Sequence, residues 1–290
     1  MTIAMRQRHT GKEKVQDGGT GILSHSAGHA VVGINMRAKT NDPLRPAVTI
    51  AGAGTSLVAA CFLAEAFERE CPRARIKVHG SMGSAALIRA VADGLITMGV
   101  TAHAKDDNAR GWGLTTLSYA RTGIVFGAHP SVPEEGITSD ALLEICRGIK
   151  TRWQDGQEIV LLHREPGNCF MEVLAAHIPG LWDAYQSGRT RITVYTDQEM
   201  NRAIATTPQA IGITDSGLLR SQRLPVKVLR FNGIAPTLEG VRAGRYPLVK
   251  TLTLVFRKER LSVEALAFLC FICSKDGAKV LHAQGYLPGE

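Results

Sequence analysis

The chain has 290 residues, of which 44% are hydrophobic and 21% are charged, and its formal net charge is +8. This length suits one large or two medium domains, and the composition is typical of a globular protein with a full core. No run of eighteen apolar residues occurs, so we expect no membrane-spanning helix.

The positive charge is spread along the chain rather than gathered in one block. Residues 1–46 contain seven basic and three acidic residues, and residues 47–290 contain 27 basic and 23 acidic residues. Each part therefore has a net charge of +4. Basic residues are not interleaved with aromatic ones, so we do not expect a nucleic acid as a partner.

The first 46 residues differ in character from the rest. Four basic residues between Arg6 and Lys14 could form the start of an export signal, but the following stretch, GILSHSAGHAVVGINM, is broken by Ser, His and Asn. Three interpretations stay open: a flexible tail, a degenerate signal, or a start codon assigned too early.

From residue 47 onward, strand patterns alternate with helix patterns. Short apolar or alternating runs predict strands, and apolar residues at helical spacing predict helices. The strands are predicted within residues 48–52, 74–80, 95–101, 120–130, 157–164, 211–213, 226–233 and 246–258. The helices are predicted within residues 55–70, 84–94, 138–148, 169–178, 196–206 and 262–288. Such alternation indicates an α/β fold with a mainly parallel sheet flanked by helices.

Six cysteines are present, and two of them form the motif Cys270-Phe-Ile-Cys273. No second CxxC and no paired histidines complete a zinc site. The motif lies in an apolar helix pattern, so we expect both thiols to be buried, with a redox or metal pair as the alternative. We expect neither a metal nor a cofactor.

Three strand-to-helix turns have a chemistry that suits an anion: Ala51–Ser56, Gly80–Ser84 and His163–Asn168. A helix start offers unpaired N–H groups and a partial positive charge. Glycine allows close approach of the backbone, and Arg164 adds a guanidinium with a geometry that suits an oxyanion. Each turn alone also has a purely structural interpretation, because Ser, Thr and Asn cap helices without any ligand.

Residues 47–290 resemble the phosphate-binding receptors of ABC importers, which have the type II periplasmic binding-protein fold. The resemblance lies in these three turns and in two later segments, FNGIAPTLEGVRAGRYPLVKTLTLVF and FICSKDGAKVLHAQGYLP. The resemblance implies two lobes, each a mixed, mainly parallel sheet flanked by helices. Lobe one would comprise residues 47–119 and 252–290, and lobe two residues 120–251. Two extended segments, near residues 118–127 and 249–256, would cross between them.

The resemblance implies that a small oxyanion binds between the lobes. The ligand-binding residues that it suggests are Thr55, Ser56, Leu57, Ser81, Gly83, Ser84, Thr101, His103, Arg164, Asn168 and Cys169. It also implies a monomeric receptor that delivers its ligand to an ABC permease in the membrane, from the periplasm or the cell surface, without catalysis.

Two positions depart from the family pattern. Asn168-Cys-Phe170 stands where the family has Ser-Gly-Thr, and Thr101-Ala-His103 stands where it has an acidic or a Ser-Arg element. A buried carboxylate can accept the proton of hydrogen phosphate, so its loss leaves tungstate, molybdate or a phosphonate as alternative ligands. Asp215 is a candidate for the missing acceptor.

Two other classes of protein are weighed against the receptor. A non-exported sensor domain would have the same fold. A cysteine-dependent hydrolase would use Cys169, at a helix start, with His163, His177 and Glu172 near it in the sequence.

Overall fold

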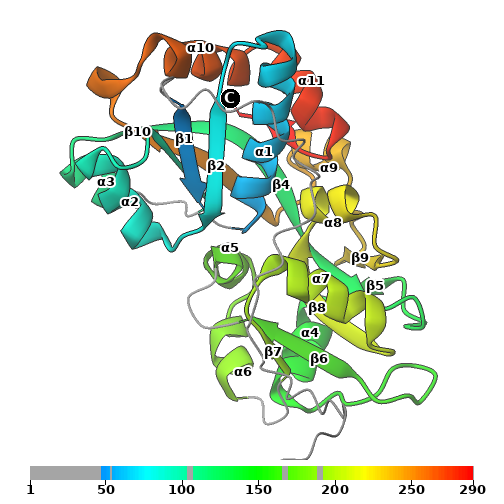
Figure 1. The fold of residues 1–290 in the computed structure, drawn as a ribbon. Helices are drawn as coiled ribbons and strands as arrows, with labels where there is room; N and C mark the ends of the chain where they lie inside the picture. Colours follow the sequence, from blue (N-terminus) through cyan, green and yellow to red (C-terminus); the bar gives the residue numbers. More distant parts are fainter. Residues whose placement is uncertain (1–46, 53, 103–106, 165–168, 188–191, 290) are drawn as a thin grey trace, which may run out of the picture. The chain divides into compact units, whose positions relative to one another are not determined.

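The computed structural model describes residues 47–52, 54–102, 107–164, 169–187 and 192–289, all of which belong to the unit formed by residues 38–290 (Figure 1). The predictions for residues 1–46, His103 and Asn168 therefore lie outside the described residues. Within the described residues, no helix combines the length and the apolar character needed to cross a membrane.

The strands form one mixed sheet with the order β2-β1-β3-β10-β4-β8-β6-β7, to which three further strands attach. Parallel pairs group around β1 and β6, and β5 also pairs with β9 in parallel. The antiparallel strand pairs of the described residues all involve β4 or β10. The strands are β1 (Val48–Gly52), β2 (Ile76–Ser81), β3 (Met98–Thr101), β4 (Thr115–Ala128), β5 (Gly136–Ile137), β6 (Val160–Arg164), β7 (Ile192–Val194), β8 (Ala210–Asp215), β9 (Lys227–Phe231), β10 (Val249–Phe256) and β11 (Leu287–Pro288).

Helices cover both faces of this sheet. In the described residues they are α1 (Gly54–Glu70), α2 (Ser84–Asp93), α3 (Asp107–Gly111), α4 (Ser139–Arg147), α5 (Cys169–His177), α6 (Leu181–Ser187), α7 (Asp197–Thr206), α8 (Ser216–Gln222), α9 (Leu238–Arg242), α10 (Val263–Ile272) and α11 (Lys275–Ala283). The observed α/β architecture confirms the predicted fold class.

Strands β4 and β10 cover the residues in which the resemblance implies two extended segments. The first part of β4, Thr115–Gly123, pairs with β10, and its last part, Ile124–Ala128, pairs with β8 (Figure 1). One long strand therefore connects the sheet region around β1 with the region around β6.

The buried apolar residues form separate clusters on the two sides of this long strand. Strands β1, β3 and β10 contribute to one cluster that includes α1, α10 and α11, and β1 and β10 also contribute to a second that includes α2. The other two clusters pack β4 and β8 against α4, α5 and α6, and β6 against α7. Alternating side chains make this possible: Ile50 lies in the first cluster and Ala51 in the second.

The expectation that Cys270 and Cys273 are buried is wrong, because both are exposed. Helix α10 instead buries Ala265, Phe268 and Phe271, which leaves Cys270 on its outer side, and Cys273 is the residue that caps its end. The sequence suggested an apolar helix, but α10 is apolar on nearly all sides, so its pattern did not reveal which side faces the core.

Candidate functional site

The first predicted turn places the start of α1 in the interior. Thr55 and Ser56 are 1% and 0% exposed. Gly54 has a φ of +54°, and a Cβ added there would collide with the carboxylate of Asp197. Glycine therefore serves two needs at this turn, a left-handed backbone and the close approach of a charged group.

Arg164 ends β6 and is buried, with an exposure of 6%. Its Nη1 atom forms a salt bridge with Asp197, and its Nη2 atom donates a hydrogen bond to the carbonyl oxygen of Tyr195 at 3.3 Å. Its backbone N–H donates to the hydroxyl of Tyr185 at 2.5 Å. Both the backbone and the guanidinium are thus fixed in place.

The carboxylate of Asp197, in the first turn of α7, links Arg164 to the start of α1. Its Oδ1 atom accepts from Arg164, and its Oδ2 atom accepts from the backbone N–H of Thr55 at 3.2 Å. The hydroxyl of Thr55 lies 3.4 Å from the same Oδ2 atom. Thr55 and Arg164, which the sequence analysis suggests as ligand-binding residues, thus both contact the carboxylate of Asp197.

Lys250 and Asp215 form a second buried ion pair beside the first. The Nζ atom of Lys250 lies 3.1 Å from Oδ2 of Asp215 and donates to the hydroxyl of Thr55 at 2.9 Å. The same hydroxyl donates to Asp215. Lys250 also lies 4.1 Å from the centroid of the Phe170 ring, within the range of a cation–π interaction.

The two ion pairs determine the ionisation of the site. Burial raises the pKa of Asp197, but Lys250 and Arg164 outweigh it, so the pKa lies below its ordinary value of 3.8. Burial lowers the pKa of Lys250, but Asp215 and the other anionic groups outweigh it, so the pKa is raised. Both groups are therefore charged at neutral pH, and each lies in a salt bridge with a group of opposite sign.

The second predicted turn lies at the start of α2. Ser81 and Gly83 are exposed and Ser84 is partly buried. Gly83 occupies the N-cap position of α2, where it has no side chain to cap the helix, and a Cβ added at Gly83 would meet no atom of the described residues within 4 Å. The purely structural capping interpretation therefore does not hold for this turn. Ser81 of this turn pairs with Gly52, which belongs to the first predicted turn.

The remaining residues suggested by the resemblance differ in burial and in their neighbours. Thr101 is buried in β3 and pairs with Thr253 of β10. Leu57 is partly buried and packs against the cluster around α1. Cys169 starts α5 near both ion pairs, but burial raises the pKa of its thiol. A thiol that resists ionisation is a poor nucleophile, so the hydrolase alternative gains no support here.

Sequence reasoning missed Asp197 and Lys250 as members of this site. Lys250 did leave a signal, because it is the one charged residue in the apolar strand segment YPLVKTLTLVF. A charge in such a strand requires a buried partner. The sequence around Asp197 contains no such signal, because an acidic residue in the first turn of a helix is common on purely structural grounds.

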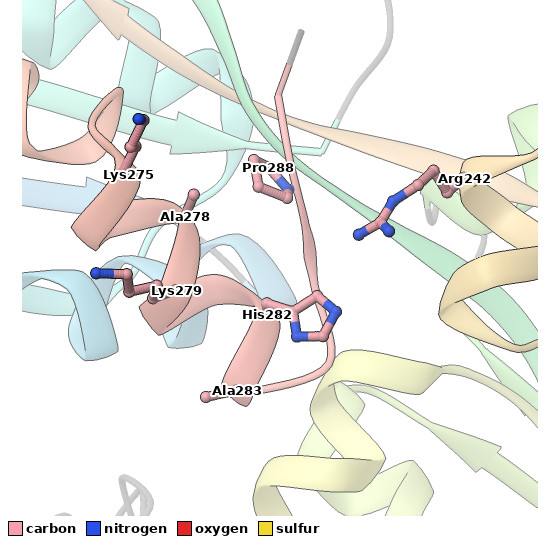
Figure 2. A pocket seen from close by; sticks show the side chains of 7 residues that line it. All are labelled: Arg242, Lys275, Ala278, Lys279, His282, Ala283 and Pro288. Carbon is pink, nitrogen blue, oxygen red and sulfur yellow. The ribbon is translucent and has the colours of Figure 1, made fainter.

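A separate pocket of about 420 Å³ lies elsewhere on the molecule, between α9 and α11 (Figure 2). Arg242 and His282 face each other across it. Its basic groups are partly neutralised by neighbours, since Arg242 pairs with Glu239 at 3.7 Å and Lys279 with Asp276 at 2.7 Å. None of the residues around Thr55 and Arg164 lines this pocket, so it is distinct from the candidate site.

A family model described as a PBP superfamily domain matches residues 37–276, which is most of the chain. The chain therefore belongs to the periplasmic binding-protein (PBP) superfamily. This match confirms the resemblance from which the two-lobed fold was expected.

Among curated proteins, phosphate-binding protein PstS 2 of Streptococcus agalactiae is 30% identical over 89 residues, which is 31% of this chain and 29% of the relative. Phosphate-binding protein PstS of Borreliella burgdorferi is 21% identical over 178 residues, which is 58% of this chain and 64% of the relative. The matched regions thus span less than two thirds of these relatives' lengths.

Solved structures show the same fold at low identity. A candidate phosphate ABC transporter substrate-binding protein from Clostridium perfringens, solved with bound phosphate, has a TM-score of 0.74 at 20% identity and is matched over 84% of this chain and 100% of its own. An ABC-type phosphate transport receptor from Vibrio cholerae has a TM-score of 0.63 at 20% identity, with the same coverage. The regulatory domain of CcmR from Synechocystis has a TM-score of 0.54 at 14% identity, over 79% of this chain and 96% of its own.

Proposed function

We propose that this chain is a receptor that binds a small oxyanion, phosphate in the first place, at the start of α1 beside Arg164. The receptor performs no covalent chemistry. Helix N–H groups, hydroxyl groups and the guanidinium hold the ligand, and the bound form then docks on an ABC permease in the membrane. The named relatives and structural neighbours that bind phosphate support this choice of ligand.

The observation that carries the proposal is the convergence of Thr55 and Arg164 on one carboxylate. A backbone N–H at a helix start and a buried guanidinium together hold the anionic group of Asp197. These are the donors that a tetrahedral oxyanion requires. Ser56 adds a buried hydroxyl that has no partner among the described residues.

The charges around the site favour an anion that carries a proton. Hydrogen phosphate can donate a hydrogen bond to a buried carboxylate oxygen, whereas sulfate at neutral pH has no proton to donate, so a carboxylate that faces the ligand would repel sulfate. Asp215 is the proposed acceptor, since Lys250 and the N–H of Leu218 at 2.9 Å hold it in the interior. Molybdate, tungstate and phosphonates are the alternative ligands.

The proposal includes the lobes expected from the sequence, with β4 and β10 as the crossing strands. The ligand would lie between residues 47–119 plus 252–290 on one side and residues 120–251 on the other. Contacts from Thr55 to Asp197 and Asp215 support this position for the ligand, because they join residues of the two proposed lobes. The receptor would act as a monomer in the periplasm or at the cell surface.

Calorimetric titration with phosphate, sulfate, molybdate, tungstate and phosphonates tests the function. Wild-type protein freed of bound anions should bind phosphate at micromolar concentration or tighter, and sulfate at least about 100-fold more weakly. Arg164→Gln should weaken phosphate binding by about 100-fold, because a buried charge-assisted contact is lost.

Arg202→Gln is the matched control, because it removes the same charge from an exposed position on α7. Its affinity should equal that of the wild type. If no oxyanion binds at micromolar concentration, or if Arg164→Gln binds as well as Arg202→Gln, the proposed function is wrong.

A non-exported sensor with the same fold is the second candidate. The CcmR regulatory domain, described in complex with 2-PG, shows that this fold also occurs in regulators. Fractionation of native cells separates the two functions, since a receptor is found outside the cytoplasmic membrane and a sensor inside it.

A further inference from the structure

The carboxylate of Asp197 lies where the donors of the proposed site converge. One oxygen accepts from the Arg164 guanidinium, and the other accepts from the Thr55 N–H at 3.2 Å. Asp197 is 7% exposed, so water replaces few of these contacts. A single internal anion thus uses both donors that the proposed ligand needs.

Asp197 is not required to cap its own helix. The cap of α7 is Thr196, whose hydroxyl accepts from the N–H of Glu199 at 3.1 Å, while Glu199 accepts from the N–H of Thr196 at 3.1 Å. The other buried acid, Asp215, is the cap of α8 and accepts from the N–H of Leu218. The two carboxylates therefore differ: Asp215 has a structural task within its own element, and the contacts of Asp197 all come from other elements.

We infer that Asp197 is a tethered substitute for the ligand, which occupies the oxyanion position until the external anion displaces it. The inference rests on the proposed function and adds an internal competitor to it. Asp197 thereby sets the affinity of the receptor and neutralises Arg164 while no ligand is bound.

A tethered group competes effectively because its local concentration is high. The apparent affinity for the external ligand then equals the intrinsic affinity multiplied by the fraction of molecules in which the site is vacant. Removing the charge of Asp197 should therefore increase the affinity, although it also removes a buried ion pair. Loss of a true ligand contact would have the opposite effect.

Titration of Asp197→Asn with inorganic phosphate tests the direction of the effect. Its Kd should be about tenfold lower than that of the wild type, because the amide does not compete for Arg164. Asp183→Asn is the matched control, since it removes the same charge from the exposed first turn of α6 and should bind as the wild type does. Asp197→Ser serves as a second variant if the asparagine variant does not fold.

Hydrogen exchange of the Thr55 amide provides a test without ligand. In phosphate-free protein, the Asp197 variant should exchange this amide faster than the wild type, because its acceptor is weaker. Phosphate should restore the protection. Unchanged exchange in the variant would overturn the inference.

The titration separates failure of this inference from failure of the proposed function. If the wild type binds phosphate and the Asp197 variants bind it equally or more weakly, the inference alone is overturned, and Asp197 is then neutral or a direct partner of the ligand. If neither the wild type nor the variants bind any oxyanion tested, the proposed function is overturned and the inference with it.

Discussion

At the scale of single residues, the candidate site is defined by four buried charges. Arg164 and Asp197 form one pair, and Lys250 and Asp215 form the other. The hydroxyl of Thr55 contacts both pairs. Burying an ion is costly unless its partner is present, so each member of a pair depends on the other.

Lys250→Met should lower the free energy of unfolding by about 3 kcal/mol, because Asp215 would remain buried without its cation. Urea unfolding at neutral pH measures this change. Lys275→Met, at an exposed position of α11, is the control and should change stability by less than about 0.5 kcal/mol.

The double variant Lys250→Met, Asp215→Asn should recover part of the lost stability. Asparagine keeps the cap of α8 and removes the unpaired charge. If Lys250→Met alone unfolds at the same urea concentration as the control, the ion pair does not contribute to stability.

At the scale of elements, the ends of helices determine where the functional groups lie. Helix α7 begins with a capping box formed by Thr196 and Glu199, and the next residue after the cap is Asp197. Because the box fixes the first turn, it also fixes the position of the carboxylate. A local sequence signal thereby places a residue whose partners lie far away in the chain.

Thr196→Ala should lower the free energy of unfolding by about 1 kcal/mol, the usual effect of losing an N-cap side chain. Thr206→Ala makes the same chemical change in the last turn of the same helix, where no cap is lost, and should change stability by less than about 0.5 kcal/mol. Thermal or urea unfolding of both variants measures the difference. Equal effects of the two substitutions would contradict a capping role for Thr196.

Helix boundaries and strands were predictable because their signals are local. The helix predicted within residues 138–148 begins after Thr138, whose hydroxyl accepts from the N–H of Ala141. The helix predicted within residues 84–94 ends at Gly94, which has a φ of +81°. The site was only partly predictable. Thr55 and Asp197 are 142 residues apart in sequence, and no local sequence pattern predicts the hydrogen bond between them. Short helices such as α6 and α9 were also missed, since too few turns exist to show a period.

At the scale of the whole molecule, ligand binding should appear as added stability. A ligand that binds only the folded state raises the free energy of unfolding by about 2.7 kcal/mol at a concentration 100 times its Kd. The lobes themselves remain a prediction, and a gain in stability would not locate them. It would show that the native fold contains the binding site.

Phosphate at 100 times its Kd should raise the Tm by roughly 5 °C or more. Scanning calorimetry with the same concentration of sulfate is the control for general effects of salt. The Arg164→Gln variant should lose most of the shift. Equal shifts with phosphate and sulfate would argue that the anions act on the whole surface rather than at one site.

The position of β10 between β3 and β4 also governs the order in which the chain can fold. Its partner strand β3 ends at Thr101, yet Thr253, with which Thr101 pairs, is synthesised much later. Helices α10 and α11, which complete the same core, come later still. During synthesis the part of the sheet formed by β2, β1 and β3 therefore keeps an open edge at β3, and such edges are prone to aggregation. The region that is made first is the last to be completed, so we expect slow folding that is limited by this long-range pairing.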